Sequence, residues 1–263
     1  YDNNAMKLKD RIRQALQQEL EPLGFRYLKS TGDFKRSINK ETNVYVYYIP
    51  DCFDRGITHV TLLAGAEYRD IEDIIYKLNN TTSAECRHFK LSCRLYWLMP
   101  KEEEREILHD ISFRNEDSDD KYREKIEKLL YWMNTYLLPY IEKLSHRESA
   151  IEATLLLDRR FLINEEFVVP VMYCVWKHDK KAALDYLEEK RLAHLKYVKP
   201  GEWGTLERMK NGETIPPKDR PLYAIAYEEY VESAKKCREV LRLGSQLLDA
   251  LPCRILRYDD LDE

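Results

Sequence analysis

The chain has 263 residues, 44% of them hydrophobic and 34% charged, with 43 lysine and arginine residues against 47 aspartate and glutamate residues. Such a composition excludes a disordered or fibrous protein. A net charge of -4 gives the chain no overall attraction to nucleic acid, so nucleic-acid binding is unsupported. The longest apolar stretch, residues 167–176, is about half the roughly 20 residues that a membrane-spanning helix needs, so we expect no membrane span.

Residues 1–5 precede Met6 and are expected to be a scar left by a protease site, outside the native fold. No apolar signal segment follows Met6. The cysteines lie far apart in a chain long enough to form a core without disulfides, which favours reduced thiols and a cytoplasmic location. They are Cys52, Cys86, Cys93, Cys174, Cys237 and Cys253.

Apolar residues at helical spacing predict an amphipathic helix over residues 7–23, which Pro22 and Gly24 end. Alternating and β-branched stretches after it predict an antiparallel meander. Residues 6–117 are therefore expected to form an α+β domain, an antiparallel β-sheet with covering helices. Its predicted strands are 25–28, 34–38, 44–49, 56–68 and 89–97, with a short helix at 71–78.

Helical spacing replaces this alternation in the rest of the chain. Residues 118–157 are predicted to form long bridging helices, one over 119–144 that Pro139 kinks or interrupts and one over 147–157. Residues 158–263 are predicted to form an all-α helical domain. Its expected elements are a helical hairpin of 165–176 and 181–197, a long loop at 199–221 and a final helix at 222–251.

The helix that ends in Leu23-Gly24-Phe25, the strand pairs after it, and the later stretches 126–130 and 138–144 resemble the bacterial domain-of-unknown-function family numbered 4304. The resemblance covers about residues 7–157. It implies an intracellular bacterial protein, and it brings no established activity or catalytic residues. The helical pair that contains residues 182–187 also resembles one unit of a tetratricopeptide-like repeat, although no second copy follows at a fixed period.

No motif is specific enough to predict a metal, cofactor or catalytic site. Cys86, His88 and Cys93 lie close together, but their spacing matches no common zinc module, and Cys93 is on the apolar face of its predicted strand. The 6 histidines are scattered, and the 8 glycines form none of the common phosphate-binding motifs. We therefore expect no catalytic residue, no metal site and no cofactor.

Two groups of residues are candidates for binding. Tyr45 and Tyr47 lie on a tyrosine-rich strand, where an aromatic face can contact a protein or stack on bases, or the rings can simply pack the sheet. Trp203 lies in the predicted loop beside several cations, and such a ring needs a surface to cover it, either on a partner or on its own domain. The cations are Arg208, Lys210, Lys218 and Arg220.

These features favour a non-enzymatic protein-interaction module, because the helical half resembles a partner-binding scaffold and no reactive cluster is visible. One alternative is a hydrolase or nuclease whose site is dispersed over Asp51, Asp54, His59 and Glu67. Another is a protein that binds a small ligand in the crevice between the domains. An enzyme should show converging titratable groups in a pocket, whereas a binding module should show an exposed contact surface.

Overall fold

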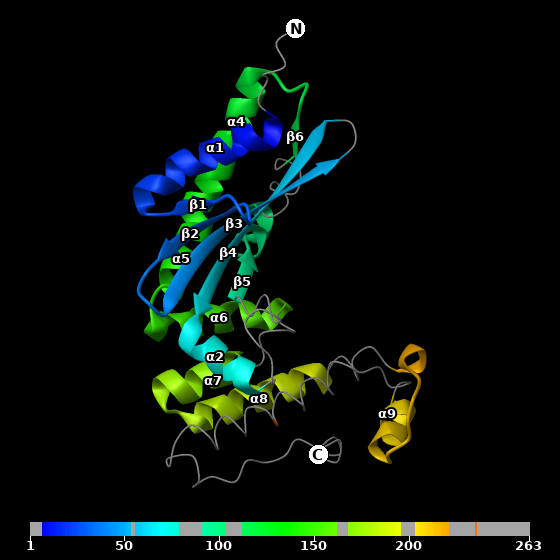
Figure 1. Ribbon diagram of the computed structural model, residues 1–263. Coiled ribbons are helices and arrows are strands. Elements are labelled where there is room, and N and C mark those ends of the chain that lie inside the picture. Colours follow the sequence, from blue (N-terminus) through cyan, green and yellow to red (C-terminus); the bar gives the residue numbers. More distant parts are fainter. Residues whose placement is uncertain are drawn as a thin grey trace. The chain divides into compact units, whose positions relative to one another are not determined.

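A computed structural model gives the fold of the chain, in which antiparallel strands and helices confirm the predicted α+β class (Figure 1). The chain forms two compact units: unit 1 is Tyr1–Arg69 with His88–Arg160, and unit 2 is Asp70–Arg87 with Phe161–Glu263. The structure describes residues 7–53, 56–78, 91–103, 112–161, 168–195, 203–220 and 235.

The units differ in outline from the domains expected from the sequence. The expected boundaries follow residues 117 and 157, whereas the contacts group the helices of 118–157 with the sheet in unit 1. The contacts also assign Asp70–Arg87 to unit 2, although this segment lies between two strands of the sheet in the sequence. The physical reason is that a compact unit is defined by packing, and a segment can pack away from its neighbours in sequence.

One antiparallel sheet forms the framework of unit 1. Its described strands lie in the order β1-β2-β3-β4-β5, and β6 pairs with the end of β4 that β5 does not reach. The longest strands, β3 and β4, each have 12 residues and pair along their whole length. The strands are β1 (Arg26–Leu28), β2 (Asp33–Ser37), β3 (Thr42–Phe53), β4 (Ile57–Tyr68), β5 (Leu91–Arg94) and β6 (Ser112–Arg114).

Helices cover one face of this sheet: α1 and α5 pack against β3, α5 also packs against β4, and α4 packs against α1 (Figure 1). The Tyr48 hydroxyl donates a hydrogen bond of 2.8 Å to the Lys9 carbonyl in α1, and burial raises the pKa of that hydroxyl. The Tyr68 hydroxyl donates one of 2.6 Å to the Leu144 carbonyl at the end of α5. The helices are α1 (Leu8–Leu20), α4 (Asp119–Trp132), α5 (Leu138–Leu144) and α6 (Arg147–Phe161).

A single row of side chains across the sheet shows where the core of unit 1 lies. Phe34, Val46, Ala64 and Cys93 are opposite one another on β2, β3, β4 and β5, and none of them is more than 1% exposed. Because successive residues on a strand face opposite sides, this row faces the helices and its neighbours face away from them. Cys93 therefore occupies the core as a small apolar side chain.

The long helix predicted over 119–144 is interrupted, as Pro139 led us to expect. A π-helical turn at Met133–Leu137 separates α4 from α5. Pro139 lies at the start of α5 and has no N–H to donate to the preceding turn, so a wider turn just before it accommodates the ring. Met133 and Leu137 are fully buried, so the interruption lies in the core of unit 1.

The described elements of unit 2 are helical. The predicted helical hairpin is confirmed, and its turn contains His178 in the left-handed conformation, with a φ of 51°. The indole N–H of Trp176 donates to a carboxylate oxygen of Asp70 at 2.9 Å, which joins α2 to the hairpin. The elements are α2 (Arg69–Leu78), α7 (Val168–Met172) with a π-helical turn at Tyr173–Lys177, α8 (Lys180–Leu195) and α9 (Trp203–Lys210).

Three local predictions differ from the structure. The segment 199–221, predicted as a loop, contains α9 and a 3-10 turn at Pro217–Asp219, because its glycines and prolines lie near the ends of these elements. The strand predicted over 89–97 is β5 followed by a 3-10 turn at Leu95–Trp97. Strand β6 lies in a segment where no strand was predicted. The predicted final helix falls outside the described residues.

Gly65 on β4 leaves room for the Tyr47 ring from β3. A Cβ atom at position 65 would lie 2.3 Å from Cε2 of Tyr47, so the ring would have to leave its stack with Tyr45. We expect Gly65→Ala to lower the free energy of unfolding by about 1–2 kcal/mol in urea denaturation. The control is Gly204→Ala in α9, where an added Cβ would meet no described atom within 4 Å apart from its chain neighbours and its own helix backbone. Equal stability of Gly65→Ala and the wild type would show that the ring moves freely.

Candidate functional site

The two tyrosines predicted as a binding surface lie together on the sheet face opposite the helices. The Tyr45 and Tyr47 rings are stacked, with centroids 5.4 Å apart and 4° between their planes. Tyr45 is only 4% exposed, and its hydroxyl donates to the carboxylate of Glu67, which also accepts a bond of 3.1 Å from Asn43. A ring buried to this extent offers no face to a base, so the stack packs the sheet.

The other predicted group lies in unit 2, where two of its cations bond within their own segment. Arg208 in α9 donates to the Glu213 carboxylate through Nε at 2.8 Å and through a second nitrogen. This pairing raises the pKa of Arg208 and lowers that of Glu213. Arg220 donates to the carbonyl of Ile215, a residue that is 2% exposed, at 2.9 Å. The Arg208–Glu213 pair joins α9 to the segment after it, and the Arg220 bond lies within that segment.

Trp203 is the first residue of α9 and Lys210 is the last. The predictions for these two side chains fall outside the part of unit 2 that is described. Of the sequence-predicted residues, the structure therefore brings Tyr45 and Tyr47 into contact and shows Arg208 and Arg220 as local structural contacts.

The four residues named for a hydrolase do not converge. Asp51 and His59 are directly opposite each other on β3 and β4. Glu67 lies further along β4, roughly 27 Å from His59 at about 3.4 Å per residue, and it bonds to Tyr45. Asp54 falls outside the described residues. Only Asp51 and His59 are therefore neighbours.

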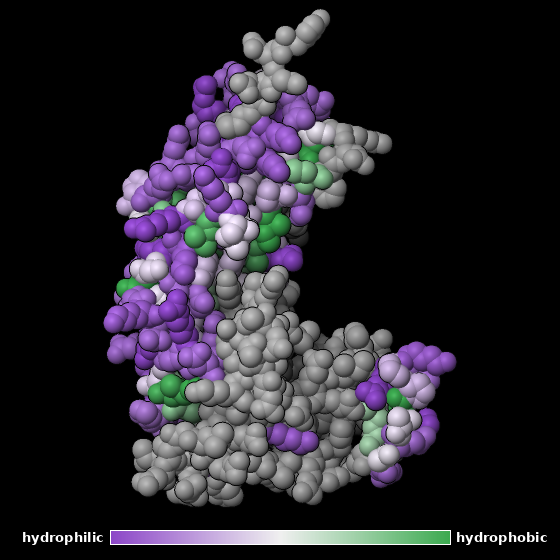
Figure 2. Space-filling view, in the orientation of Figure 1, coloured by the Kyte–Doolittle hydropathy of each residue, from purple (hydrophilic) through white to green (hydrophobic). Residues whose placement is uncertain are grey.

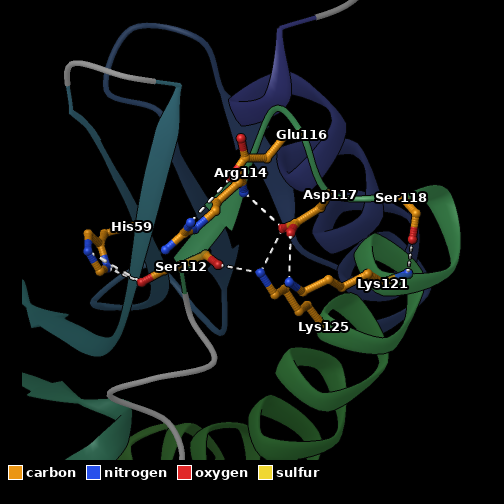
Figure 3. Close-up of polar contacts among 8 residues, drawn as sticks. All are labelled: His59, Ser112, Arg114, Glu116, Asp117, Ser118, Lys121 and Lys125. Carbon is orange, nitrogen blue, oxygen red and sulfur yellow. Dashed lines mark hydrogen bonds and ion pairs between the residues drawn. The ribbon is translucent and has the colours of Figure 1, made fainter.

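His59 has a hydroxyl partner that the sequence did not suggest (Figure 3). The Ser112 Oγ on β6 lies 2.7 Å from His59 Nδ1, and the two residues are opposite each other on β6 and β4. Asp51, His59 and Ser112 are thus in register across three strands. A hydroxyl beside an imidazole is the arrangement of a nucleophile and its base.

The same view shows a buried ion cluster at the start of α4 (Figure 3). The side chain of Asp117 is 3% exposed, and its carboxylate contacts Lys125 at 2.7 Å, the Arg114 N–H at 2.9 Å and Lys121 at 3.3 Å. Burial raises the pKa of Asp117, but these donors outweigh burial and hold the pKa below its usual value. Lys125 also donates to the Ser112 carbonyl at 2.7 Å, so the cluster fastens β6 to α4.

A groove of about 910 Å³ lies between α1 and β1. One wall is a stripe of α1, because residues three and four positions apart share a helix face. The other wall is the turn after α1 and the edge strand β1, whose only strand partner among the described residues is β2. The surface over α1 is mainly hydrophilic (Figure 2). The lining residues are Asp10, Arg13, Gln17, Glu21, Gly24, Phe25, Arg26, Tyr27 and Lys29.

The polar side chains on the α1 wall bond to one another. Arg13 donates to Gln17 at 3.0 Å and lies 3.7 Å from Asp10, and Gln17 donates to Glu21. The Arg13 guanidinium also lies over the Tyr27 ring, 4.8 Å from its centroid. This stripe is therefore ordered by its own contacts.

The β1 wall is different, because its cations have no partner in the described part of the chain. Arg26 and Lys29 are both exposed, and neither makes an ion pair or a side-chain hydrogen bond with a described residue. Two uncommitted cations beside an ordered polar stripe make this groove the best candidate for a binding site in unit 1.

The sequence contained a signal for this groove that our predictions did not use. Asp10, Arg13, Gln17 and Glu21 recur at helical spacing within the predicted helix, opposite its apolar stripe, and the predicted first strand follows directly. What the sequence could not supply was the position of β1 at the sheet edge, which depends on pairing between distant strands.

Among the described residues, no three His, Cys, Asp or Glu side chains are placed to hold a metal ion. None of the described helices has both the length and the apolar character to cross a membrane. Comparisons of the chain with protein-family models, with curated proteins and with solved structures give no match. The resemblance to family 4304 and to a tetratricopeptide-like unit therefore stays a prediction.

Proposed function

We propose that this chain is a non-enzymatic protein-interaction module that works in the cytoplasm. The observation that carries the proposal is the groove between α1 and β1. An edge strand with unpartnered backbone groups is a common docking site for another chain, and here it lies beside a groove with two uncommitted cations.

Two further observations support the proposal. The residues that line the groove include no cysteine, histidine, serine or threonine, and its two carboxylates, Asp10 and Glu21, are in contact with Arg13 and Gln17. The described cysteines, Cys52, Cys93 and Cys174, are free thiols, a state that a reducing compartment maintains.

The proposal is tested by crosslinking in a lysate of the source cell. The intact chain is treated with an amine-reactive crosslinker, and the crosslinked peptides are identified by mass spectrometry. We expect crosslinks to one partner protein at Lys29, because its exposed amine lies on the groove. Lys29→Arg keeps the charge and removes the reactive amine, so it should lose these crosslinks only. A chain that crosslinks to no protein above the background of an unrelated protein would contradict the proposal.

A hydrolase is the second candidate, and the contact between His59 and Ser112 favours it. If Ser112 is an activated nucleophile, a fluorophosphonate probe should label it covalently, and Ser112→Ala should abolish the label. We expect no labelling, because His59 and Ser112 are cross-strand neighbours whose contact the sheet alone explains. Stoichiometric labelling of Ser112 would overturn this expectation and establish the hydrolase.

A further inference from the structure

We propose that the groove between α1 and β1 binds an extended acidic peptide segment of a partner protein, which adds to the edge of β1 as a strand. The inference rests on the proposed function and names the chemistry of the partner. It combines three observations: the open edge of β1, the size and walls of the groove, and the charges that its contacts leave uncommitted.

The backbone of β1 offers hydrogen-bonding groups at its outer edge. The Leu28 carbonyl accepts bonds from the Thr31 and Gly32 N–H groups, so it points toward the β1–β2 turn. Successive residues of a strand direct their backbone groups to opposite edges, so the N–H and C=O of Tyr27 point away from β2. Among the described residues, no backbone hydrogen bond outside the sheet ladder uses these two groups. A peptide strand can pair with them.

The groove has room for such a strand. Its volume of about 910 Å³ is in the range of roughly 300–1,000 Å³ that holds a compact ligand. Residues of α1 line one side of the groove and residues of β1 line the other, so a chain lying there contacts both a helix and a strand. Because β1 has only three residues, backbone pairing alone is short, and side-chain contacts must supply much of the specificity.

The charges select an acidic segment. Of the carboxylates that line the groove, Asp10 lies 3.7 Å from the Arg13 guanidinium, and Glu21, the residue after α1, accepts a hydrogen bond from Gln17. Among the described residues, the cations on the β1 side have no such partners. Arg26 lies opposite Lys35 on β2, so these two cations share the sheet face that is turned away from the helices. A carboxylate in the peptide can accept a bidentate bond from Arg26.

A peptide fits these charges better than a nucleic acid does. A polyanion carries one phosphate charge at every step, whereas Arg26 and Lys29 are only two cations and both lie on one wall of the groove. In a strand paired with β1, alternate side chains face the helices and the opposite face of the sheet, so a peptide can place carboxylates beside Arg26 and other side chains beside α1.

The test is a display selection with the intact chain. A library of random peptides about ten residues long is selected on the immobilised wild type, and the affinity of the enriched peptides is measured by fluorescence anisotropy. We expect enriched peptides with an excess of Asp and Glu and without proline in the middle, since proline cannot complete a strand pairing. N-methylation of alternate backbone amides should weaken binding about tenfold.

Charge-reversed variants locate the site. We expect Arg26→Glu with Lys29→Glu to weaken the selected peptide at least about tenfold, because two attractive contacts become repulsive. The control, Lys40→Glu with Lys101→Glu, changes the net charge by the same amount at exposed positions and should change affinity less than about twofold. Both variants should keep the wild-type thermal unfolding, because the substitutions are at the surface.

Each other outcome overturns the inference. Enriched peptides that are not acidic, or that bind the Arg26→Glu/Lys29→Glu variant unchanged, place the site or its chemistry elsewhere. Duplex DNA that binds as tightly as the peptide, with the same dependence on Arg26 and Lys29, identifies a polyanion site instead. The crosslinking experiment separates these cases from the proposed function: a partner crosslinked away from Lys29 keeps the interaction module and rejects this groove.

Discussion

Phe34→Ala should lower the free energy of unfolding by about 4 kcal/mol. Phe34 is fully buried on β2, and its ring packs 5.3 Å from the ring of Tyr27 on the edge strand β1. It also lies opposite Val46 in the row that crosses the sheet. Alanine would leave a cavity between the edge strand and the helices, which the surrounding side chains can fill only in part.

The loss should be measured by urea denaturation followed by circular dichroism. Phe34→Leu keeps most of the volume and should cost less than about 1.5 kcal/mol, which separates the cavity from any effect of the aromatic ring. The alanine variant should also weaken the acidic peptide, because Tyr27 forms part of the groove and would lose its support. A loss of stability below about 1 kcal/mol would mean that Phe34 is not in the packed core.

Asp117→Asn should cost about 2 kcal/mol at neutral pH, because it leaves Lys125, whose side chain is 13% exposed, without its carboxylate partner. Glu116→Gln is the matched control. Glu116 pairs with Arg114 at 3.2 Å, but both side chains are more than half exposed, so its loss should change stability by less than about 0.5 kcal/mol.

The effect of Asp117 should depend on pH in a defined direction. In the folded chain the pKa of Asp117 is lowered below the value of about 3.9 that is usual for an unfolded aspartate. The ionised carboxylate therefore contributes stability that is fully present above this unfolded pKa and is lost as the pH falls through the folded one. Denaturation midpoints of wild type and Asp117→Asn should converge as the pH falls below about 4. A constant difference down to the lowest accessible pH would contradict the assignment.

Local periodicity explains which elements the sequence could predict. The apolar stripe of α1 extends over about three turns and the alternation in β4 over about a dozen residues, so both stand out from chance. Strand β6 has three residues in a polar segment and exists because Phe113 is fully buried and packs 5.8 Å from the ring of Tyr122 on α4. No local pattern carries that information.

The candidate site shows the same limit. The sequence marks Tyr45 and Tyr47 as binding candidates because their strand is rich in tyrosine, but the Glu67 carboxylate that accepts from the Tyr45 hydroxyl comes from another strand. The exposed cations Arg26 and Lys29 have no distinctive spacing, and they mark a groove only because β1 is an edge strand beside α1. Motif searches cannot find a site of this kind, because it is formed by tertiary contacts between distant segments.

The most direct test of the account is residue-specific amide hydrogen exchange, measured by nuclear magnetic resonance on the intact chain with and without a saturating acidic peptide from the selection. Strand addition to β1 predicts that exchange at Tyr27 slows at least about tenfold, while exchange in the segment after α9 stays unchanged. Slowed exchange confined to the segment after α9, with Tyr27 unaffected, would contradict the groove and return the binding site to unit 2.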